Sequence, residues 1–408
     1  MEPSRLPYAG VRVVDFSRLL PGGWCTQFLA DCGADVIKVE HPGEGDYARQ
    51  NPPTFRHTGV YFNSVNRNKR SIGLDLAHPQ SRTVVRRLLE VADVVVESFR
   101  PGVPARLGMD YAAARACNAG VIYCSLTGFG QDGPLAEQAG HDLNIQGMTG
   151  LMGLGLEPGE LPRVPGFQAG DYSGATMACL GIMAGLAAKS RTGQGCYLDI
   201  SMFDALFSMC NIVTTGALSR LAGGTGRPAM EPWGANPRYA VYAAGDGLPV
   251  SVSLLERKFW KLFCEEVGQP ELYNEQEESH ERHTDHGERR ERYRQAIADF
   301  CRAHPRAELV RRMHASGIPV FPVNTPDEAV LAPVVQARGM VEFIEHPRDG
   351  RIPQLGNPIA RSGLADTRHA PAPELGAHTD EVLAELGFSP PERAELEQRG
   401  AIRHEPSP

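Results

Sequence analysis

The chain has 408 residues, of which 42% are hydrophobic and 22% charged, as in an ordinary globular protein of two or three domains, or of one large domain with an insertion. Its net charge of −8 argues against nucleic acid as the main partner, because phosphate binding needs a basic surface, but a few local Arg or Lys residues could still bind a small anion. The nine cysteines include no C-x-x-C pair, which argues against a zinc site and favours a reducing cytoplasm. The sequence shows neither an apolar signal-peptide region nor an apolar run of about eighteen residues, so we expect a soluble protein without a membrane span.

Short β-rich runs alternate with helical patterns through the first half of the chain. The predicted strands are Val11–Phe16, Ala34–Glu40, Ser71–Leu76, Asp93–Phe99 and Val121–Leu126, and the predicted helices between them are Trp24–Asp31 and Pro79–Val91. Buried strands separated by helices predict an α/β domain with a parallel sheet covered on both faces. Ligands of such sheets bind beyond the carboxyl ends of the strands, which places Pro21–Gly23 and the residues after Glu40 and Phe99 on one rim. No G-x-G-x-x-G follows the first strand, so we reject a dinucleotide-binding fingerprint.

The second half begins with a long predicted helix, Tyr172–Lys189, whose small and apolar residues predict burial on all sides. A strand at Cys196–Met202 and a further helix follow, and then a linker-like stretch at 223–238. The next residues predict a smaller α+β domain with strands at Tyr239–Ala243 and Pro249–Leu254 and helices near 256–267, 290–303 and 306–316. The expected organisation is a large α/β domain over 1–222, a small α+β domain over 223–332, and a C-terminal segment over 333–408 that returns to the large domain.

Two later stretches carry local signals. Asn274–Arg292 is dense in charge and contains His280, His283 and His286; a solvated loop is favoured over a metal site because Glu and Arg residues surround the histidines. The chain is predicted to end in helices at Thr379–Leu386, with Thr379 as the N-cap, and Pro391–Arg399.

Three acid/base groups stand at the predicted ends of elements. Asp171 precedes the long uncharged helix, where a capping role is the ordinary explanation, although the small residues after it would leave space for a substrate. His141 and Asp142 precede another helical stretch, with Asp142 placed as an N-cap and His141 more often a structural hydrogen-bonding group than a catalyst at such a position. Glu256 stands at a strand-to-helix junction.

Ordered motifs along nearly the whole chain resemble those of the family III CoA-transferases, which include the α-methylacyl-CoA racemases. These motifs are LLPGGWCTQFLADCGADVIKVEHPGEGD (19–46), NRNKRSIGLDL (66–76), ESFRPGVPARLG (97–108), SLTGFGQDGP (125–134), AGHDLN (139–144), GDYSG (170–174), TGQGCYLDISMFDA (192–205) and LGAHTDEVLAELG (375–387). The resemblance implies an interlocked homodimer, each chain having a Rossmann-like large domain formed by both ends of the chain and a smaller domain.

The resemblance makes Asp171 the expected catalytic residue. In the transferases the matching carboxylate attacks the acyl-CoA carbonyl and forms a mixed anhydride, after which a second acid takes over the CoA. In the racemases the matching Asp and a His exchange protons across the substrate α-carbon. His141 matches that His, and Glu256 matches the acid that orients it. We therefore expect a racemase of 2-methyl-branched acyl-CoA. A CoA-transferase is the alternative, and a non-catalytic CoA-binding protein is the third hypothesis.

The same resemblance implies where CoA binds. Lys38 is expected beside the adenine, Lys69, Arg70 and Arg106 at the phosphates, and Ser98 at a CoA-contacting position where an Asn is common in the family. From the residues alone, an ordinary basic turn before a strand is the favoured explanation of Lys69 and Arg70. No metal is expected, and no cofactor beyond the CoA moiety of the substrate.

Overall fold

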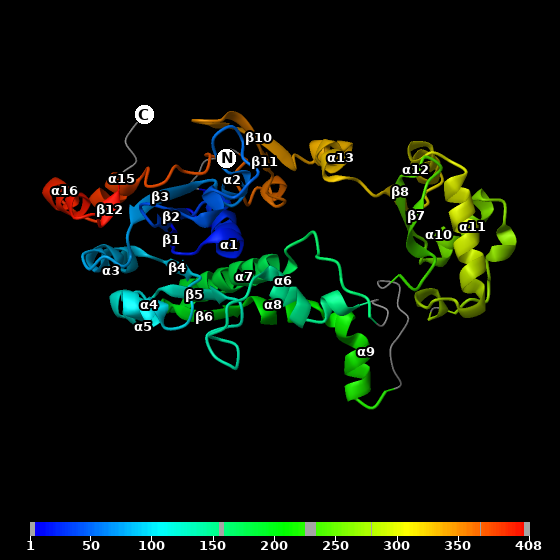
Figure 1. Ribbon diagram of the computed structural model, residues 1–408, viewed down its shortest axis with the longest axis horizontal. Helices are drawn as coiled ribbons and strands as arrows, with labels where there is room; N and C mark the ends of the chain where they lie inside the picture. The colour runs from blue at the N-terminus through cyan, green and yellow to red at the C-terminus, as the bar shows by residue number, and fades with distance from the viewer. Residues whose placement is uncertain (1–4, 155–158, 225–233, 279, 368, 404–408) are drawn as a thin grey trace. The chain divides into compact units, whose positions relative to one another are not determined.

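The computed structural model describes residues 5–154, 159–224, 234–278, 280–367 and 369–403, which divide into two compact units (Figure 1). The first unit combines 1–152, 163–211 and 333–408, so it contains both ends of the chain. The second combines 153–162 and 212–332. No helix within the described ranges is both long and apolar enough to cross a membrane.

A seven-stranded sheet forms the centre of the first unit, in the order β12-β3-β2-β1-β4-β5-β6. Its strands are β1 (Arg12–Asp15), β2 (Asp35–Glu40), β3 (Lys69–Leu74), β4 (Val94–Glu97), β5 (Ile122–Thr127), β6 (Cys196–Ser201) and β12 (Ile402–Arg403). All neighbouring pairs are parallel except β12 with β3. The structure thus confirms the predicted parallel α/β sheet, and each strand predicted for the first half of the chain is present.

Helices cover both faces of this sheet, which explains why its strands are apolar on both sides. The helices of the first unit are α1 (Leu19–Asp31), α2 (Val60–Asn66), α3 (Ser81–Val91), α4 (Val103–Leu107), α5 (Tyr111–Cys117), α6 (Asp142–Met148), α7 (Ala169–Thr192), α8 (Met202–Met209), α14 (Pro333–Ala337), α15 (Thr379–Glu385) and α16 (Pro390–Gln398). Apolar side chains of β1, β2 and β4 lie in one buried core with side chains of α3 and α15. This core includes Val14, Ile37 and Val95 of the strands, Leu88 of α3 and Val382 of α15. Figure 1 shows β12 and α15, in red, beside β3, in blue, so the C-terminal segment completes the N-terminal sheet.

The strand order reverses between β1 and β4, which are parallel neighbours although β2 and β3 lie between them in the sequence. At such a reversal the connections leave the sheet in opposite directions, and the carboxyl ends of the two strands open a crevice. The residues that follow these strands are Phe16–Leu19 and Ser98–Pro101. This reversal positions the candidate site.

The second unit is a small α+β structure with its own core. Its three-stranded antiparallel sheet comprises β7 (Tyr239–Ala243), β8 (Pro249–Ser253) and β9 (Val320–Pro322), and its helices are α9 (Asn211–Leu221), α10 (Arg257–Glu266), α11 (Arg290–Arg302), α12 (Arg306–Ala315) and α13 (Pro326–Leu331). Trp260, Phe263 and Ile297 lie in the core. A two-stranded hairpin of the first unit, β10 (Val341–His346) and β11 (Gly350–Leu355), follows this unit in the chain.

The 274–292 stretch is not the uniformly solvated loop that its composition predicts. Glu277 is buried and accepts hydrogen bonds from the guanidinium of the fully buried Arg238 at 2.9 and 3.0 Å, and His286 is buried beside this pair. The pairing compensates the desolvation of both charges. His280 remains exposed, as a solvated loop requires.

Two further predictions about helices are wrong. Helix α7 is not buried on all sides, because Leu180 is 52% exposed on a face that no described element of the chain covers. Its small residues instead allow close packing: a Cβ atom at Gly174 would lie 2.7 Å from Met202 of α8. Thr379 is the first residue of α15 rather than its N-cap, because its hydroxyl is bonded to the backbone of Gly376 and Gly73.

Candidate active site

A cavity of about 680 Å³ lies at the carboxyl ends of the central strands, within the first unit. Its walls come from the segments after β1, β4 and β5 and from the first turns of α7 and α8. The polar and charged side chains among its lining residues are Arg18, Tyr47, Asn51, Tyr61, Ser98, Arg100, Thr127, Gln138, His141 and Asp171. The cavity therefore occupies the place where the topology predicts ligand binding, and it contains two of the three acid/base candidates.

Asp171 is the third residue of α7, whose N-cap is Gln168, so it lies in the first turn rather than in the capping position. Its side chain is partly buried, and among the described residues no group donates a hydrogen bond to its carboxylate. Burial is the main cause that raises the pKa of Asp171 to about 7, and the negative charge of Asp142 adds to it. The result is a reactive carboxylate without a partner, facing a cavity that can hold a substrate.

Asp142 takes the capping role that the sequence assigns to Asp171. It is the first residue of α6, and its Oδ1 accepts hydrogen bonds from the backbone N–H groups of Gly170 at 2.7 Å and Asp171 at 3.2 Å. Its Oδ2 accepts from the side-chain amide of Gln146 at 2.7 Å. A Cβ atom at Gly170 would lie 3.1 Å from Asp142 Oδ1 and 3.0 Å from Ile145, so the glycine permits this approach. Helix α6 thus caps helix α7 and leaves the Asp171 side chain free.

His141 is the N-cap of α6 and is exposed on the cavity wall. Its backbone N–H donates to Asn144 Oδ1 at 3.0 Å. Among the described residues of the first unit, no carboxylate lies within ion-pair distance of its ring. Glu256 stands at the junction of β8 and α10, as the sequence predicts, but it is exposed in the second unit. Within the first unit the structure brings together His141 and Asp171.

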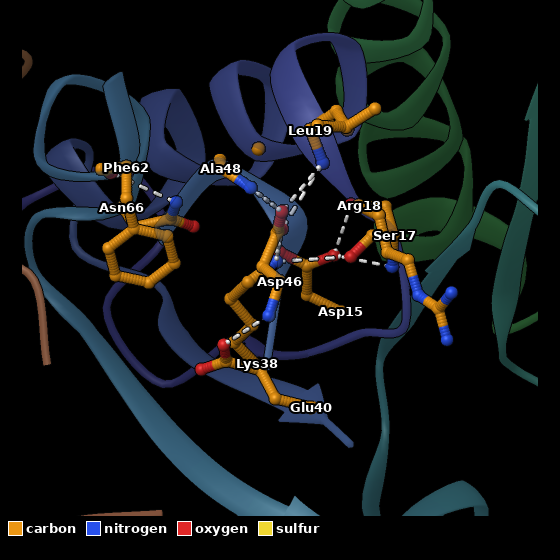
Figure 2. A network of polar contacts seen from close by, with 12 residues as sticks. Asp15, Ser17, Arg18, Leu19, Lys38, Glu40, Asp46, Ala48, Phe62 and Asn66 are labelled. Atoms are coloured by element: carbon orange, nitrogen blue, oxygen red, sulfur yellow. Dashed lines mark hydrogen bonds and ion pairs between the residues drawn. The ribbon is translucent and has the colours of Figure 1, made fainter. Parts of the chain in front are cut away.

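The start of α1 is held from two sides and forms the floor of the cavity at Arg18 and Leu19. Ser98 Oγ accepts from the backbone N–H of Arg18 at 3.2 Å, and both carboxylate oxygens of Asp46 lie 3.2 Å from the backbone nitrogen of Leu19 (Figure 2). Leu19 has a φ of 62°, a left-handed conformation that is strained for a residue with a side chain. The Asp46 carboxylate satisfies an otherwise orphan N–H of the first turn and maintains this conformation.

A buried charge network beneath this floor holds Lys38 and Asp46 together. Lys38 Nζ lies 2.9 Å from Asp46 Oδ2 and donates to the carbonyl of Ser17 at 3.0 Å, and both charged side chains are buried (Figure 2). Burial alone would lower the pKa of Lys38, but the charges of Asp46 and Asp15 outweigh it and raise that pKa. The Lys38 side chain has no exposed surface, and its expected place beside the adenine stays a prediction.

Lys69 belongs to the same network and is also buried. Its ammonium lies 3.2 Å from Asp15 Oδ2 and donates to Asn66 Oδ1 at 2.8 Å and to the Gly23 carbonyl at 2.9 Å. Burial lowers the pKa of Lys69 to about 8, with Asp15 opposing that shift. Lys69 therefore links α1, α2 and β1 internally, and its expected contact with a CoA phosphate stays a prediction.

The remaining expected CoA contacts differ in their surroundings. Arg70 is bonded to Asp35 of β2 and to Glu381 and Glu385 of α15, at 2.7 to 2.9 Å. Arg106 is exposed in the last turn of α4 and does not line the cavity, whereas Ser98 does. Arg70 therefore already has carboxylate partners that join the C-terminal segment to the sheet.

A second, smaller cavity of about 200 Å³ adjoins the same edge of the sheet. Polar and charged residues line part of it, and the apolar part of its lining comprises Phe16, Val39, Leu74, Leu76, Ala77, Phe99 and Leu107. Arg18 and Phe99 line both cavities. Sequence reasoning missed Arg18, Arg100 and Tyr61 as lining residues; the rim position of the segments after the first and fourth strands was the signal that could have found the two arginines.

The cavity lies where the strand order of the parallel sheet reverses, and its lining combines one carboxylate with cationic and neutral groups. These features are typical of an α/β protein that binds an anionic small molecule. The chain belongs to the CoA-transferase family III, whose family model matches residues 8–379, and is therefore an enzyme that acts on acyl-CoA. It is 34% identical to a succinate–glutarate CoA-transferase of Agrobacterium fabrum, over 93% of this chain and 96% of that one. It is also 34% identical to an acetyl-CoA:oxalate CoA-transferase of Acetobacter aceti, over 90% and 93%. The crystal structure of a CAIB/BAIF family protein from Brucella suis matches with a TM-score of 0.78 and 32% identity, over 93% of this chain and 99% of that one.

Proposed function

We propose that this enzyme transfers CoA between carboxylic acids, with Asp171 as the nucleophile. The unpartnered Asp171 carboxylate in the cavity carries the proposal, because a nucleophile must reach the substrate carbonyl with a free lone pair. The names of the relatives favour this activity over the racemase that the His141, Asp171 and Glu256 set suggested.

The acids are expected to include a dicarboxylic acid. The relatives reported above are named for succinate and glutarate or for oxalate, and a further relative at 32% identity is named a succinyl-CoA:mesaconate CoA-transferase. Each of these acids carries two carboxylates. We therefore propose succinyl-CoA and glutarate as the first substrate pair to test.

The reaction can be written with every bond accounted for. An Asp171 oxygen attacks the thioester carbonyl, the C–S bond breaks, and CoA leaves as the thiolate, giving an acyl-aspartyl anhydride. The thiolate then attacks the Asp171 carbonyl, which releases the donor acid and leaves CoA on Asp171 as a thioester. The acceptor carboxylate attacks that thioester, and the same two steps run in reverse to give the new acyl-CoA and free Asp171. No step needs a metal or a redox cofactor in this scheme.

The two cavities suggest how CoA is held. The smaller cavity would accept the adenine ring, and the larger one would accept the thioester and the acyl group beside Asp171. Arg18 and Phe99 line both cavities, so the two are continuous in their lining. Arg100 on the cavity wall is exposed and supplies a cation for a CoA phosphate.

We also propose a homodimer. The exposed apolar residues Leu180 on α7 and Phe207 and Met209 on α8 support this proposal, because exposed apolar clusters commonly mark subunit interfaces. Light scattering of the purified protein would give the mass of two chains.

Trapping of the enzyme-bound intermediate tests the proposed chemistry. Incubation with succinyl-CoA and hydroxylamine should convert Asp171 to a hydroxamate that peptide mass spectrometry locates, while incubation without acyl-CoA should leave it unmodified. Asp171→Asn should abolish both the trapping and the transfer to glutarate. His141→Gln should retain the hydroxamate. Exchange of the α-proton of a 2-methylacyl-CoA in D2O, lost in His141→Gln and without any hydroxamate, would establish the racemase instead.

A further inference from the structure

We infer that Arg18 binds the distal carboxylate of the acyl group, which makes it the residue that selects dicarboxylic over monocarboxylic substrates. This inference rests on the proposed transferase function and assigns the side chain that recognises the second carboxylate. The recognition site is formed by Arg18 together with the rings of Tyr47 and Phe99, all three of which line the cavity that contains Asp171.

The first observation is that Arg18 lacks a carboxylate partner. Other arginines at this sheet are paired: Arg49 with Glu40 at 2.7 Å, and Arg67 with Asp31 at 2.6 Å. Among the described residues no acid lies within ion-pair distance of Arg18, and its one side-chain hydrogen bond goes to the Tyr47 hydroxyl at 3.1 Å. A guanidinium has five N–H donors in a planar fork that matches a carboxylate, so most of its donors are open to a ligand.

The second observation is that Arg18 is held in place. Its guanidinium carbon lies 5.2 Å from the centre of the Tyr47 ring and 5.8 Å from that of the Phe99 ring, distances at which a cation is attracted to an aromatic face. Its backbone N–H is bonded to Ser98 Oγ, and Asp46 holds the next residue, Leu19. A cation positioned in this way loses little conformational entropy when it binds an anion.

The third observation is the charge distribution of the cavity. Among the residues that line it, Asp171 is the sole acid, while Arg18 and Arg100 are cations. A dicarboxylic acid must bring one carboxyl group to Asp171 for the reaction and place the other in the same cavity. An unpaired carboxylate is costly to desolvate, so the second group requires a cation. Arg18 is partly buried between two rings, whereas Arg100 is exposed, so Arg18 is the better placed of the two.

Donor and acceptor acids react at the same Asp171 in turn, so one distal site serves both. A monocarboxylic acyl group of equal length would leave the Arg18 guanidinium without a partner. The monocarboxylic substrate lacks the pair of charge-assisted hydrogen bonds that the dicarboxylic substrate forms with Arg18, and this difference makes the enzyme selective for the dicarboxylic substrate.

A matched pair of substrates tests this assignment. Succinyl-CoA and butyryl-CoA carry four-carbon acyl groups that differ in the terminal carboxylate. The wild-type enzyme should have the higher kcat/KM with succinyl-CoA, and Arg18→Gln should lower the succinyl-to-butyryl ratio of kcat/KM by roughly 10- to 100-fold. Arg18→Lys should restore part of the ratio. As the matched control, Arg100→Gln should raise KM for both thioesters and leave the ratio unchanged.

Equal losses with both thioesters in Arg18→Gln would overturn the assignment, because Arg18 would then bind the CoA moiety or support the fold. An unchanged ratio would also overturn it. Titration calorimetry in the Asp171→Asn background separates this inference from the proposed reaction: Arg18→Gln should weaken the binding of succinyl-CoA relative to butyryl-CoA even if Asp171 never forms an anhydride. Missing hydroxamate in the wild-type enzyme would count against the transferase chemistry alone.

Discussion

The Asp142 carboxylate accepts a hydrogen bond from the backbone N–H of Asp171 at 3.2 Å, which places two acidic residues at the same helix start. Asp142 satisfies the donors of the first turn of α7 and interacts favourably with the positive end of the helix dipole. Its negative charge also adds to the effect of burial in raising the pKa of Asp171, whose carboxylate accepts no hydrogen bond among the described residues. Asp142 thus caps the helix and Asp171 is the proposed nucleophile, and this division between two carboxylates has measurable consequences.

Asp142→Asn should move the pH dependence of the transfer reaction. The reactive form of Asp171 is the carboxylate, so kcat/KM of the wild-type enzyme should rise with pH and level off above about 7. Removing the charge of residue 142 should shift this rise to lower pH by roughly one unit at most, because burial is the larger cause of the raised pKa. Asp110→Asn, at the N-cap of α5 outside the cavity, is the matched control and should leave the profile in place.

Asp171→Asn should stabilise the fold, and the gain should depend on pH. The pKa of Asp171 is about 7 in the folded state, whereas the ordinary pKa of an Asp side chain is 3.8. The folded state therefore holds the proton more tightly, and stability is lost as pH rises through this interval. The gain in the free energy of unfolding should grow from about pH 4, level off above about pH 7, and reach on the order of 2 kcal/mol after allowance for solvent screening. Urea titrations of both proteins at several pH values measure this gain. A gain that is equal at all pH values would contradict the prediction.

Breaking the buried Lys38–Asp46 pair should destabilise the protein and disturb the cavity floor. Asp46→Asn or Lys38→Met alone leaves a buried charge without its partner, which typically costs about 3 to 5 kcal/mol. The double variant should recover part of that loss, and denaturant unfolding gives the coupling free energy. Strictly additive losses would show that the two side chains do not interact. Since Asp46 also holds the strained Leu19 backbone, Asp46→Asn should lower kcat more than Lys38→Met does.

Arg70→Gln should affect stability rather than CoA binding. Arg70 is bonded to Asp35, Glu381 and Glu385, and these partly exposed pairs together contribute about 1 kcal/mol. We expect a small loss in the free energy of unfolding and an unchanged KM for acyl-CoA, in contrast to the higher KM expected for Arg100→Gln. A large rise in KM for Arg70→Gln would restore the phosphate-binding role that the family resemblance implies.

The elements of the sheet and the main candidate residue could be predicted from the sequence. The apolar strands and the helices between them are local patterns, and burial on both faces of a parallel sheet makes such strands recognisable without their neighbours. The motif around Asp171 identified the family, which the comparisons confirm. The preference for a racemase was not supported, because it rested on the types of residue at positions 141, 171 and 256, and residue types do not show how a His is oriented.

The sequence by itself determined the strands, the family and Asp171 as the expected reactive group, because each depends on residues that are close together in the chain. The surroundings of Asp142, Lys38, Lys69 and Arg18 became visible only in the tertiary structure. Asp142 caps a helix whose bonded residue, Gly170, is 28 positions away, and Lys69 is bonded to Asp15, which is 54 positions away. Arg18 differs from the other arginines at the sheet because no carboxylate of the described residues lies within ion-pair distance of it. A side chain's charge is visible in the sequence, but its freedom to bind a substrate depends on which partners the fold brings to it. Asp171 is free for chemistry because the fold supplies another carboxylate to cap its helix.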